Sequence, residues 1–255
     1  MHKNNHIFRF RHHHGEIFSA NLRFLYDFKL KATMTLLDAI VQRHSVRRYT
    51  TQPIDSHLVE QLQSLIGECN AQGGLRIQLV TEEPRAFGSW LVHYGAFSGV
   101  RNYVALVGAK AEDLDERIGY YGERIVLEAQ RMGLNTCWVA LTYKKVPGTI
   151  TIGPDERLRC VISIGYGVDN GHGHKIKTID RVSRCQGEMP QWFRQGVEAA
   201  LLAPTAINQQ KFRFTLHEGD VVEATHGFGP YAAIDLGIVK YHFELGASPH
   251  PFTWK

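Results

Sequence analysis

Residues 43–49 read Arg-His-Ser-Val-Arg-Arg-Tyr and follow directly on a short amphipathic pattern. Arg43 and Arg47 stand on either side of Ser45, so two guanidinium groups and a hydroxyl lie close together in the sequence. Guanidinium groups make paired hydrogen bonds to phosphate oxygens, and a serine hydroxyl adds a neutral donor. Taken alone, this spacing is more typical of a solvated basic surface than of a phosphate site.

Residues 203–212 form a second informative stretch, Ala-Pro-Thr-Ala-Ile-Asn-Gln-Gln-Lys-Phe. Pro204 ends the helical pattern before it, because proline restricts the backbone of the residue that precedes it. The small side chains that follow would let a flat ligand approach the backbone closely. The Asn208 amide offers both a donor and an acceptor to the edge of a ring. A plain connection between a helix and a strand is the simpler interpretation of this stretch alone.

Outward from these two stretches, helical and strand-like patterns are mixed along the chain. The strands do not alternate regularly with crossover helices, which favours the α+β class over a doubly wound sheet. Apolar residues recur at helical spacing over residues 35–43, 55–69, 115–132, 191–202 and 234–247. Short apolar or alternating runs predict strands over residues 76–80, 103–108, 161–167, 211–218 and 221–227, with an extended segment over 135–141.

The composition is that of an ordinary globular protein, with 44% hydrophobic and 21% charged residues in a chain of 255. The formal net charge of +4 suits an anionic cofactor as well as a nucleic acid. No nucleic-acid-binding motif accompanies this charge, so we expect no nucleic-acid partner. No run reaches the ~18 apolar residues of a membrane span. The N-terminus also lacks a signal-peptide pattern, and we expect a cytoplasmic protein without a membrane partner.

Residues 1–33 are rich in His, Arg and Phe and show no clear helical or strand period. They predict a poorly packed extension before a domain over residues 34–255. Three consecutive histidines, at positions 12–14, lack a second ligand cluster, so we predict no metal site. The four cysteines form no C-x-x-C pair and are expected to be reduced, mostly buried thiols.

Together, the two stretches resemble the motifs of the FMN-dependent nitroreductase family. Residues 43–49 are similar to that family's opening R-[RH]-S-x-[RK]-x-[FY] pattern, and residues 203–210 are similar to its A-P-S-x-x-N-x-Q segment. Residues 133–138, Gly-Leu-Asn-Thr-Cys-Trp, look like its G-L-G-T-C-W stretch, and residues 163–167 look like its late strand and turn. The resemblance covers nearly all of residues 34–255.

The order of the motifs differs from that of ordinary family members, which are homodimers whose flavin sites combine the two motifs from different subunits. Here the second motif follows the first by about 160 residues in the same chain. The resemblance therefore implies a fused pseudo-dimer of the divergent single-chain branch. It implies an α+β, nitroreductase-like fold with a central mixed sheet flanked by helices and two pseudo-symmetric halves. The first half would span 34–167, the connector 168–180 and the truncated second half 181–255, in a monomer with one flavin site.

The resemblance also assigns cofactor-binding roles to residues from several segments. Arg47 would approach the N1/O2 edge of the isoalloxazine, where a cation stabilises the negative charge of the reduced ring. The backbone near Ala140 and Leu141 would face the N5/O4 edge. The FMN phosphate would be held by the motif residues Arg43 and Ser45, with His44 in the same segment and help from Lys175 and Lys177, and the ring would be covered by Pro204, Thr205, Ala206 and Asn208.

The implied reaction passes a hydride from NAD(P)H through flavin N5 to a small acceptor such as a nitroaromatic compound or a quinone. Because the flavin carries this chemistry, no catalytic side chain is predicted. Tyr94, Phe97, Tyr120 and Tyr121 are candidates for an acceptor pocket, although core packing is the more common role of such aromatic residues. A non-catalytic flavin-binding or sensor protein of the same fold is the alternative.

Overall fold

The structure is a computed structural model, and it describes residues 34–88 and 97–255. Residues Thr35–Lys255 form one compact unit. The extension predicted over residues 1–33, and the pocket candidate Tyr94, lie outside the described residues. In the part of the chain that is described, no helix combines the length and the apolar character needed to cross a membrane.

The first sheet is formed by the early part of the chain and is buried on both faces. Its strands run in the order β1-β2-β4-β3, and every neighbouring pair is antiparallel. Along β2, Val104 and Leu106 belong to one core cluster, while Tyr103 and Ala105 belong to a second cluster, as expected when successive side chains alternate between faces. The elements of this part are β1 (Gln78–Val80), η1 (Pro84–Phe87), β2 (Asn102–Ala109), β3 (Asn135–Val139) and β4 (Glu156–Gly165), with α3 (Ser56–Gly73) and α5 (Leu114–Arg131).

The second sheet is mixed. Strands β6 and β7 form an antiparallel hairpin, and β5 and β8 each pair in parallel with one edge of it. The α+β class is therefore confirmed, with the strands divided between an antiparallel and a mixed sheet instead of one central sheet. The elements of this part are α6 (Ile179–Val182), β5 (Ser183–Arg184), α7 (Gln191–Leu201), η2 (Ala206–Asn208), β6 (Phe212–His217), β7 (Val221–His226), α8 (Ala232–Ala247) and β8 (Thr253–Trp254).

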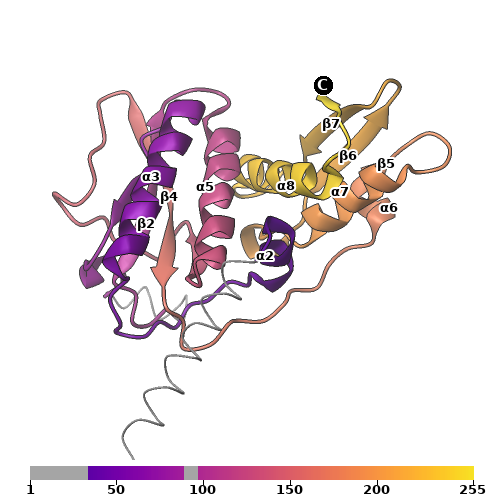
Figure 1. The fold of residues 1–255 in the computed structure, drawn as a ribbon. Coiled ribbons are helices and arrows are strands. Elements are labelled where there is room, and N and C mark those ends of the chain that lie inside the picture. The colour runs from indigo at the N-terminus through magenta and orange to yellow at the C-terminus, as the bar shows by residue number, and fades with distance from the viewer. Residues whose placement is uncertain (1–33, 89–96) are drawn as a thin grey trace, which may run out of the picture. The chain divides into compact units, whose positions relative to one another are not determined.

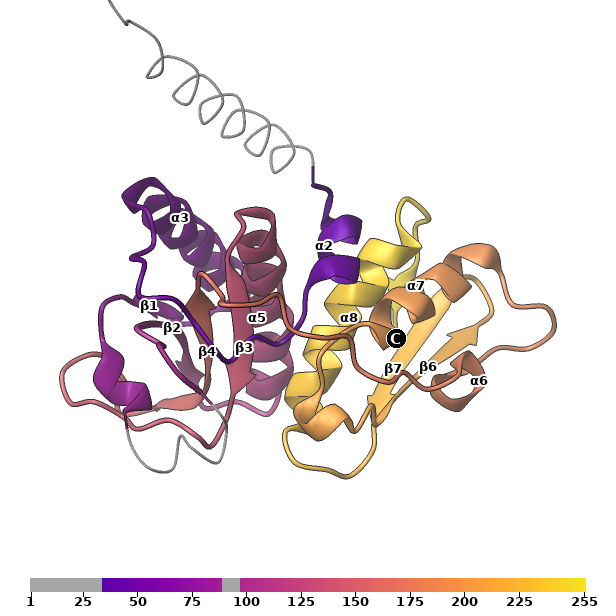
Figure 2. The same ribbon diagram turned by 90° about the horizontal axis from the view of Figure 1, so that it is seen from below.

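Helices α5 and α8 join the two parts of the chain, because they pack directly against each other (Figures 1 and 2). A Cβ on Gly119 of α5 would collide with the Ile234 carbonyl oxygen, and a Cβ on Gly237 of α8 would collide with the Glu116 carbonyl oxygen. Glycine therefore allows the two helix backbones to approach this closely. Helix α8 is apolar almost all round, as expected of a helix that also packs against α7 and α2 (Leu36–Gln42).

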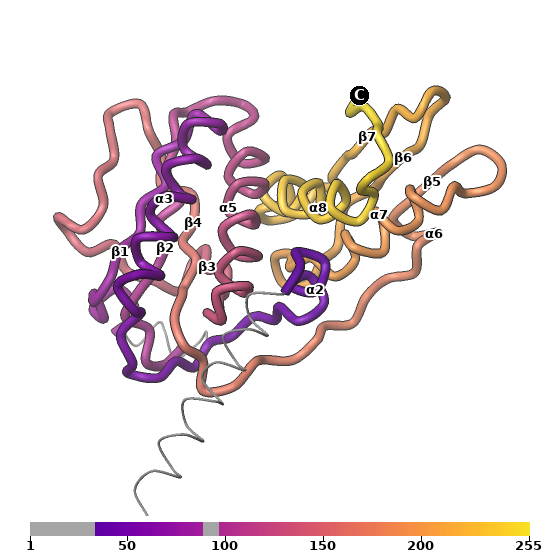
Figure 3. Tube along the Cα trace, in the orientation of Figure 1, coloured from indigo at the N-terminus to yellow at the C-terminus, as the bar shows by residue number. Residues whose placement is uncertain are grey.

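One hydrophobic core runs through both parts of the chain. It includes Leu106 of β2, Ile118 of α5, Phe214 of β6 and Phe243 of α8. The two sheets therefore share buried apolar surface across the α5–α8 contact. Figure 3 shows the connection between them, which leaves β4, passes the segment between α2 and α3, and continues to α6.

Most predicted elements are present, with shifted ends. The helix predicted over residues 55–69 continues to Gly73. Gly74 caps its C-terminal end, with a φ of 58°. The strand predicted over residues 161–167 begins earlier, at Glu156, where it already pairs with β2. The elements α6, β5 and β8 were not predicted, because segments of two to four residues are too short to show a period.

Candidate functional site

Two adjoining cavities lie where residues 43–49, here the early segment, meet residues 204–210, here the late loop. Their volumes are about 140 Å³ and about 520 Å³. The smaller one is lined mostly by apolar side chains and is called the apolar cavity. The larger one is lined by several arginine and histidine side chains and is called the basic cavity. The two cavities share the lining residues Ser45, Arg47, Pro204, Thr205 and Ile207.

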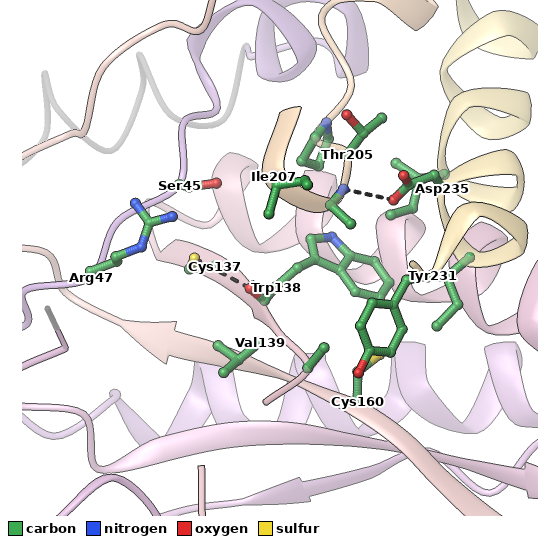
Figure 4. A pocket seen from close by; sticks show the side chains of 15 residues that line it. Ser45, Arg47, Cys137, Trp138, Val139, Cys160, Thr205, Ile207, Tyr231 and Asp235 are labelled. Carbon is green, nitrogen blue, oxygen red and sulfur yellow. Dashed lines mark hydrogen bonds between the residues drawn. The ribbon is translucent and has the colours of Figure 1, made fainter. Parts of the chain in front are cut away.

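A tryptophan ring forms part of the lining of the apolar cavity. In Figure 4, Ser45, Arg47 and Cys137 lie on one side of it, Tyr231 and Asp235 lie on the other, and the Trp138 ring lies between them. This lining suits a flat apolar ligand that also makes a few polar contacts. Small or aliphatic side chains complete the lining: Val139, Ala140, Ala206, Ile234 and Ile238, together with the thiol of Cys160.

The early segment is fixed against the first sheet. Val46 donates its N–H to the Thr136 carbonyl oxygen of β3 at 3.0 Å. The Tyr49 hydroxyl is buried and donates to the Val46 carbonyl oxygen at 2.8 Å. Because Val46 packs into the core, the side chains of its neighbours Ser45 and Arg47 are left to line the cavities.

Arg43 begins this segment and is almost fully buried, with 3% of its surface exposed. It lines the basic cavity, and its Nε lies 3.9 Å from Oε1 of Glu123, beyond hydrogen-bond distance. Among the described residues, this Nε has no hydrogen-bond partner. Burial lowers the pKa of Arg43, and the nearby Glu123 carboxylate opposes that shift. A buried guanidinium with an unpaired N–H favours an anion in the adjoining cavity.

Glu123 of α5 is fully buried and links the two parts of the chain. Its carboxylate accepts hydrogen bonds from Trp138 Nε1 and from His242 Nε2 of α8, each at 2.8 Å. His242 Nδ1 lies 3.1 Å from the Ala199 carbonyl oxygen, so both ring nitrogens face acceptors. One carboxylate therefore orients the tryptophan of the apolar cavity, lies next to Arg43 and ties α5 to α8.

The late loop has an unusual backbone. Ile207, Asn208 and Gln210 have φ values of 48°, 55° and 46°, in the left-handed region that residues other than glycine rarely adopt. The conformation is costly for Ile207, because its side chain is branched at Cβ, and 87% of its surface is exposed. Strained backbone of this kind is typical of binding sites, where surrounding contacts hold it in place.

Buried side chains hold the late loop in this conformation. The Asp235 carboxylate of α8 accepts hydrogen bonds from the Ala206 N–H at 2.9 Å and from Gln209 Nε2 at 2.7 Å. Burial raises the pKa of Asp235 to about 6, and the two hydrogen bonds limit that rise. Asp235 lines the apolar cavity as well. A single buried carboxyl group thus borders the cavity and fixes the loop that covers it.

The basic cavity is lined by far more basic than acidic groups. Asp169 is paired with Arg48 at 2.6 Å, and this hydrogen bond lowers the pKa of the carboxyl group. Burial, followed by the charge of Arg43, lowers the pKa of His44. Such a lining suits an anion with several acceptor oxygens. The basic residues are Arg43, His44, Arg47, Arg48, His172 and His174.

The family described as "Putative TM nitroreductase" matches residues 35–247. The chain belongs to this nitroreductase family. The match spans every strand of both sheets except β8, and all of the segments that line the two cavities. The resemblance seen in the sequence motifs is therefore confirmed, and membership places the protein among oxidoreductases in general.

A solved nitroreductase structure has a similar fold. A structure from Thermotoga maritima described as a "putative nitroreductase" is similar over 95% of this chain and 88% of its own, with 20% identity and a TM-score of 0.59. A second one, from Desulfovibrio desulfuricans in complex with FMN, covers 58% of this chain and 95% of its own, with 18% identity and a TM-score of 0.45. No curated protein matches the chain.

The two cavities of this nitroreductase bring together most of the residues that the motifs singled out. Leu141 lines neither of them and is 77% exposed. Lys175 and Lys177 also line neither cavity; the Lys175 carbonyl oxygen and Lys177 Nζ form hydrogen bonds with the late loop. The residues brought together are Arg43, His44, Ser45, Arg47, Ala140, Pro204, Thr205, Ala206 and Asn208.

Several lining residues were not predicted, although the sequence contains signals for some of them. Asp235 is an acidic residue among the apolar residues that begin a helical run, a pattern that indicates a buried partner. His172 and His174 alternate with glycine in a connector without any period, so periodicity could not find them. Trp138 lies inside a quoted motif, but nothing in the sequence shows that its ring faces a cavity.

The three described aromatic candidates for an acceptor pocket lie elsewhere. Phe97 is buried, and the Arg47 guanidinium carbon lies 5.9 Å from the centre of its ring. The ring of Tyr120 packs between those of Tyr121 and Tyr241. None of the three described candidates lines either cavity, and core packing accounts for their positions.

The thiols in the apolar cavity are not poised for nucleophilic chemistry. Burial raises the pKa of both Cys137 and Cys160, so both are protonated at neutral pH. Among the described residues, no cluster of His, Cys, Asp and Glu is arranged to hold a metal ion. The site therefore offers binding and electrostatic groups for a ligand that carries its own chemistry.

Proposed function

We propose that this nitroreductase is an FMN-dependent oxidoreductase that passes hydride from NAD(P)H to a small acceptor such as a nitroaromatic compound or a quinone. The observation that carries the proposal is the meeting of the early segment and the late loop at two adjoining cavities. One cavity is basic and the other is apolar with a polar rim. An anionic group attached to a flat ring system matches that pair of environments.

The residues present fit such a cofactor. Arg43, Ser45 and Arg47 would hold the phosphate, since they line the basic cavity and the buried Arg43 Nε lacks an acceptor among the described residues. Trp138 and Ile207 would hold the ring, since they line the apolar cavity with broad apolar surface. The match supports FMN because its phosphate and its ring would each meet suitable groups in two adjoining cavities.

When bound, the flavin supplies the hydride chemistry that amino-acid side chains lack. The residues of the chain bind, orient and shield it. Arg47 lines both cavities and keeps a positive charge at their junction, where it would stabilise negative charge on the ligand. The apolar side chains of Val139 and Ile238 keep water away from the inner wall.

We also propose that the site is complete within one chain, so that the protein is a monomer with one flavin. In this proposal residues 34–167 supply one side of the site and residues 181–255 supply the other, as in a fused pseudo-dimer. Support comes from the compact unit Thr35–Lys255, which contains both stretches. Glu123 and Asp235, which hold the two sides in place, belong to the same unit.

Turnover by the purified chain tests the proposal. Supplied with FMN, it should oxidise NADH or NADPH steadily when a quinone or a nitroaromatic acceptor is present. Arg47→Gln should weaken FMN binding roughly tenfold or more, because it removes a charged hydrogen-bond donor. Arg101→Gln is the matched control, since Arg101 pairs with Glu82 and lines neither cavity.

Two results would count against this function. FMN binding without any turnover would show a flavin-binding protein and not an enzyme. Equal FMN affinities for Arg47→Gln and Arg101→Gln would show that the ligand does not occupy the junction of the two cavities.

A further inference from the structure

The connector contributes His172 and His174 to the basic cavity. We propose that these two histidines bind the phosphate group of the ligand in their imidazolium form, so that phosphate binding takes up protons. The inference rests on the proposed function only for the identity of the ligand. Any phosphomonoester, or free phosphate, would meet the same groups in this cavity.

The connector is held directly against the early segment. Gly171 has a φ of 69°, and its N–H donates to Oδ1 of Asp169 at 2.9 Å. A Cβ at Gly171 would come within 2.9 Å of His44 Cβ and 3.0 Å of the Ser45 carbonyl oxygen, so glycine is needed for this close approach. His172 follows immediately and lines the same cavity as Ser45. The cavity therefore has a third wall, formed by the connector.

The hydrogen bond made by His174 determines what its ring can offer a ligand. Nε2 lies 3.1 Å from the Leu201 carbonyl oxygen. A carbonyl oxygen only accepts, so Nε2 must carry the proton in the neutral ring. Nδ1 is then the nitrogen left for a ligand, and in the neutral ring it has a lone pair and no proton. It can donate to a phosphate oxygen only after the ring becomes an imidazolium.

The groups around the histidines favour protonation of the imidazole rings once an anion is present. Of the described residues that line the cavity, Asp169 is the one acid, and it is already paired with Arg48. The late loop contributes only uncharged lining residues. In the absence of an anion, close positive charges oppose one another, and a bound phosphate relieves this repulsion. The charged or titratable groups facing the histidines are Arg43, His44, Arg47, Arg48 and Asp169.

The neighbouring lysines have a different task. The Lys175 carbonyl oxygen accepts hydrogen bonds from Asn208 Nδ2 at 2.9 Å and from Gln210 Nε2 at 2.8 Å. Lys177 Nζ donates to the carbonyl oxygens of Gln209 and Gln210 at 2.9 Å and 2.8 Å. These contacts tie the connector to the late loop. The two lysine side chains of this segment thus do not line the cavity, whereas its two histidines do.

Binding measurements with three ligands test the inference. FMN, riboflavin and inorganic phosphate are titrated against the wild-type chain at about pH 6 and about pH 8, on either side of the range in which histidine changes charge. The ratio of FMN affinity to riboflavin affinity isolates the phosphate group. This ratio should be roughly tenfold lower at the higher pH than at the lower pH. The second ionisation of the phosphate acts in the opposite direction, because it adds negative charge to FMN as the pH rises.

A double variant and a matched control complete the test. The double variant His172→Gln/His174→Gln keeps neutral donors of similar size but cannot become cationic. Its affinity ratio at about pH 6 should be roughly tenfold below that of the wild type, because charged hydrogen bonds are lost. The ratio should also no longer fall with rising pH. Lys175→Gln changes a side chain in the same segment that does not line the cavity, and it should leave the ratio and its pH trend unchanged.

The outcomes separate this inference from the proposed function. A wild-type affinity ratio and pH trend in the double variant would overturn the role of the histidines, whether or not the protein turns over NAD(P)H. Phosphate binding that takes up protons in a chain that binds no flavin would support the histidines and contradict the flavin function. Calorimetry of phosphate binding in two buffers with different heats of ionisation measures the proton uptake directly.

Discussion

The early segment and the late loop border the same two cavities, but they are held in place by different means. The early segment pairs with β3 through the bridge between Ser45 and Thr136, and its core side chains are buried. The late loop contains the positive-φ residue Ile207 and depends on the hydrogen bonds that the Ala206 N–H and Gln209 Nε2 donate to the Asp235 carboxylate. One wall is part of a sheet, and the other is a strained loop fixed by a few side chains.

Because of this difference, substitutions in one wall should mainly affect folding stability, and substitutions in the other should mainly affect ligand binding. The early wall forms when the first sheet and its core form, so damage to it should cost global stability. The late wall is added by local contacts, so changes there should alter ligand binding at a smaller cost in stability. The following substitutions test that separation, beginning with the largest expected effect.

Glu123→Ala should have the largest effect on stability. It leaves Trp138 Nε1, His242 Nε2 and the Arg43 guanidinium without their buried carboxylate. Loss of one partner from a buried charged network costs about 3–5 kcal/mol in the free energy of unfolding. Urea denaturation measures the change. Glu123→Gln keeps one acceptor oxygen and should cost less, which provides a folded variant if the alanine variant fails to fold.

Glu68→Ala is the control for this prediction. Its carboxylate forms a largely exposed pair with Arg124, and pairs of this kind contribute about 1 kcal/mol or less. If Glu123→Ala cost no more than Glu68→Ala, the buried network would not be what holds the early wall.

Asp235→Asn should change the pH dependence of stability, because burial raises the pKa of Asp235 to about 6. A group with a higher pKa in the folded protein stabilises it most below its unfolded pKa, and this contribution is lost as the pH rises through 6. From about pH 4 to about pH 7, the wild type should lose roughly 2–3 kcal/mol of unfolding free energy relative to the variant. Urea denaturation at the two pH values measures this difference.

Asp169→Asn should change the pH dependence of stability in the opposite direction. Its hydrogen bond with Arg48 lowers the pKa of this carboxyl group, so its contribution is present at neutral pH and is lost as the pH falls. If both substitutions changed the pH dependence in the same direction, burial would not be what controls the pKa of Asp235.

Tyr49→Phe tests the early wall with a smaller change. The variant keeps the buried ring but loses the hydroxyl that donates to the Val46 carbonyl oxygen and lies 2.9 Å from Ser163 Oγ. We expect a loss of about 1–2 kcal/mol in unfolding free energy, because a buried hydrogen-bonding network loses its central group. Calorimetric melting measures the loss. An unchanged melting temperature would show that sheet pairing alone fixes the segment.

Ile207→Asn should have the smallest effect on stability, and it should stabilise the protein instead of destabilising it. Asparagine tolerates a φ near 48° better than a β-branched residue, so the variant should gain about 1 kcal/mol. Because Ile207 lines the apolar cavity, riboflavin affinity should fall several-fold even though stability rises. Ile152→Asn, at another exposed isoleucine outside the cavities and without positive φ, should produce neither effect.

The sequence predicted the α+β class, the main helices and strands, and the two stretches that line the cavities. These features follow from local signals: apolar periodicity, glycine after a helix, and short motifs. The division into two sheets was not predicted, because strand partners are chosen by packing between distant segments. Glu123 and Asp235 were missed for a similar reason, since each lies on a helix and meets partners that are distant in the sequence. Glu123 meets His242 only after α5 packs against α8, and Asp235 meets Ala206 only after the late loop folds against α8.

The connector shows a second limit of local signals. The motif pattern favoured Lys175 and Lys177 as phosphate ligands, whereas the cavity is lined by His172 and His174. Which residues of a segment without a period face a cavity depends on how closely its backbone approaches other segments, as Gly171 does at His44 and Ser45. A pattern of residue types identifies the segment but not the side chains it presents.

The stoichiometry of FMN in a single-chain species tests the central claim most directly. In sedimentation followed at both protein and flavin absorbance, the account predicts that FMN moves with the monomer, at one FMN per chain. Flavin found only in a dimer would contradict a site built within one chain, and a protein that takes up no FMN would contradict the site itself.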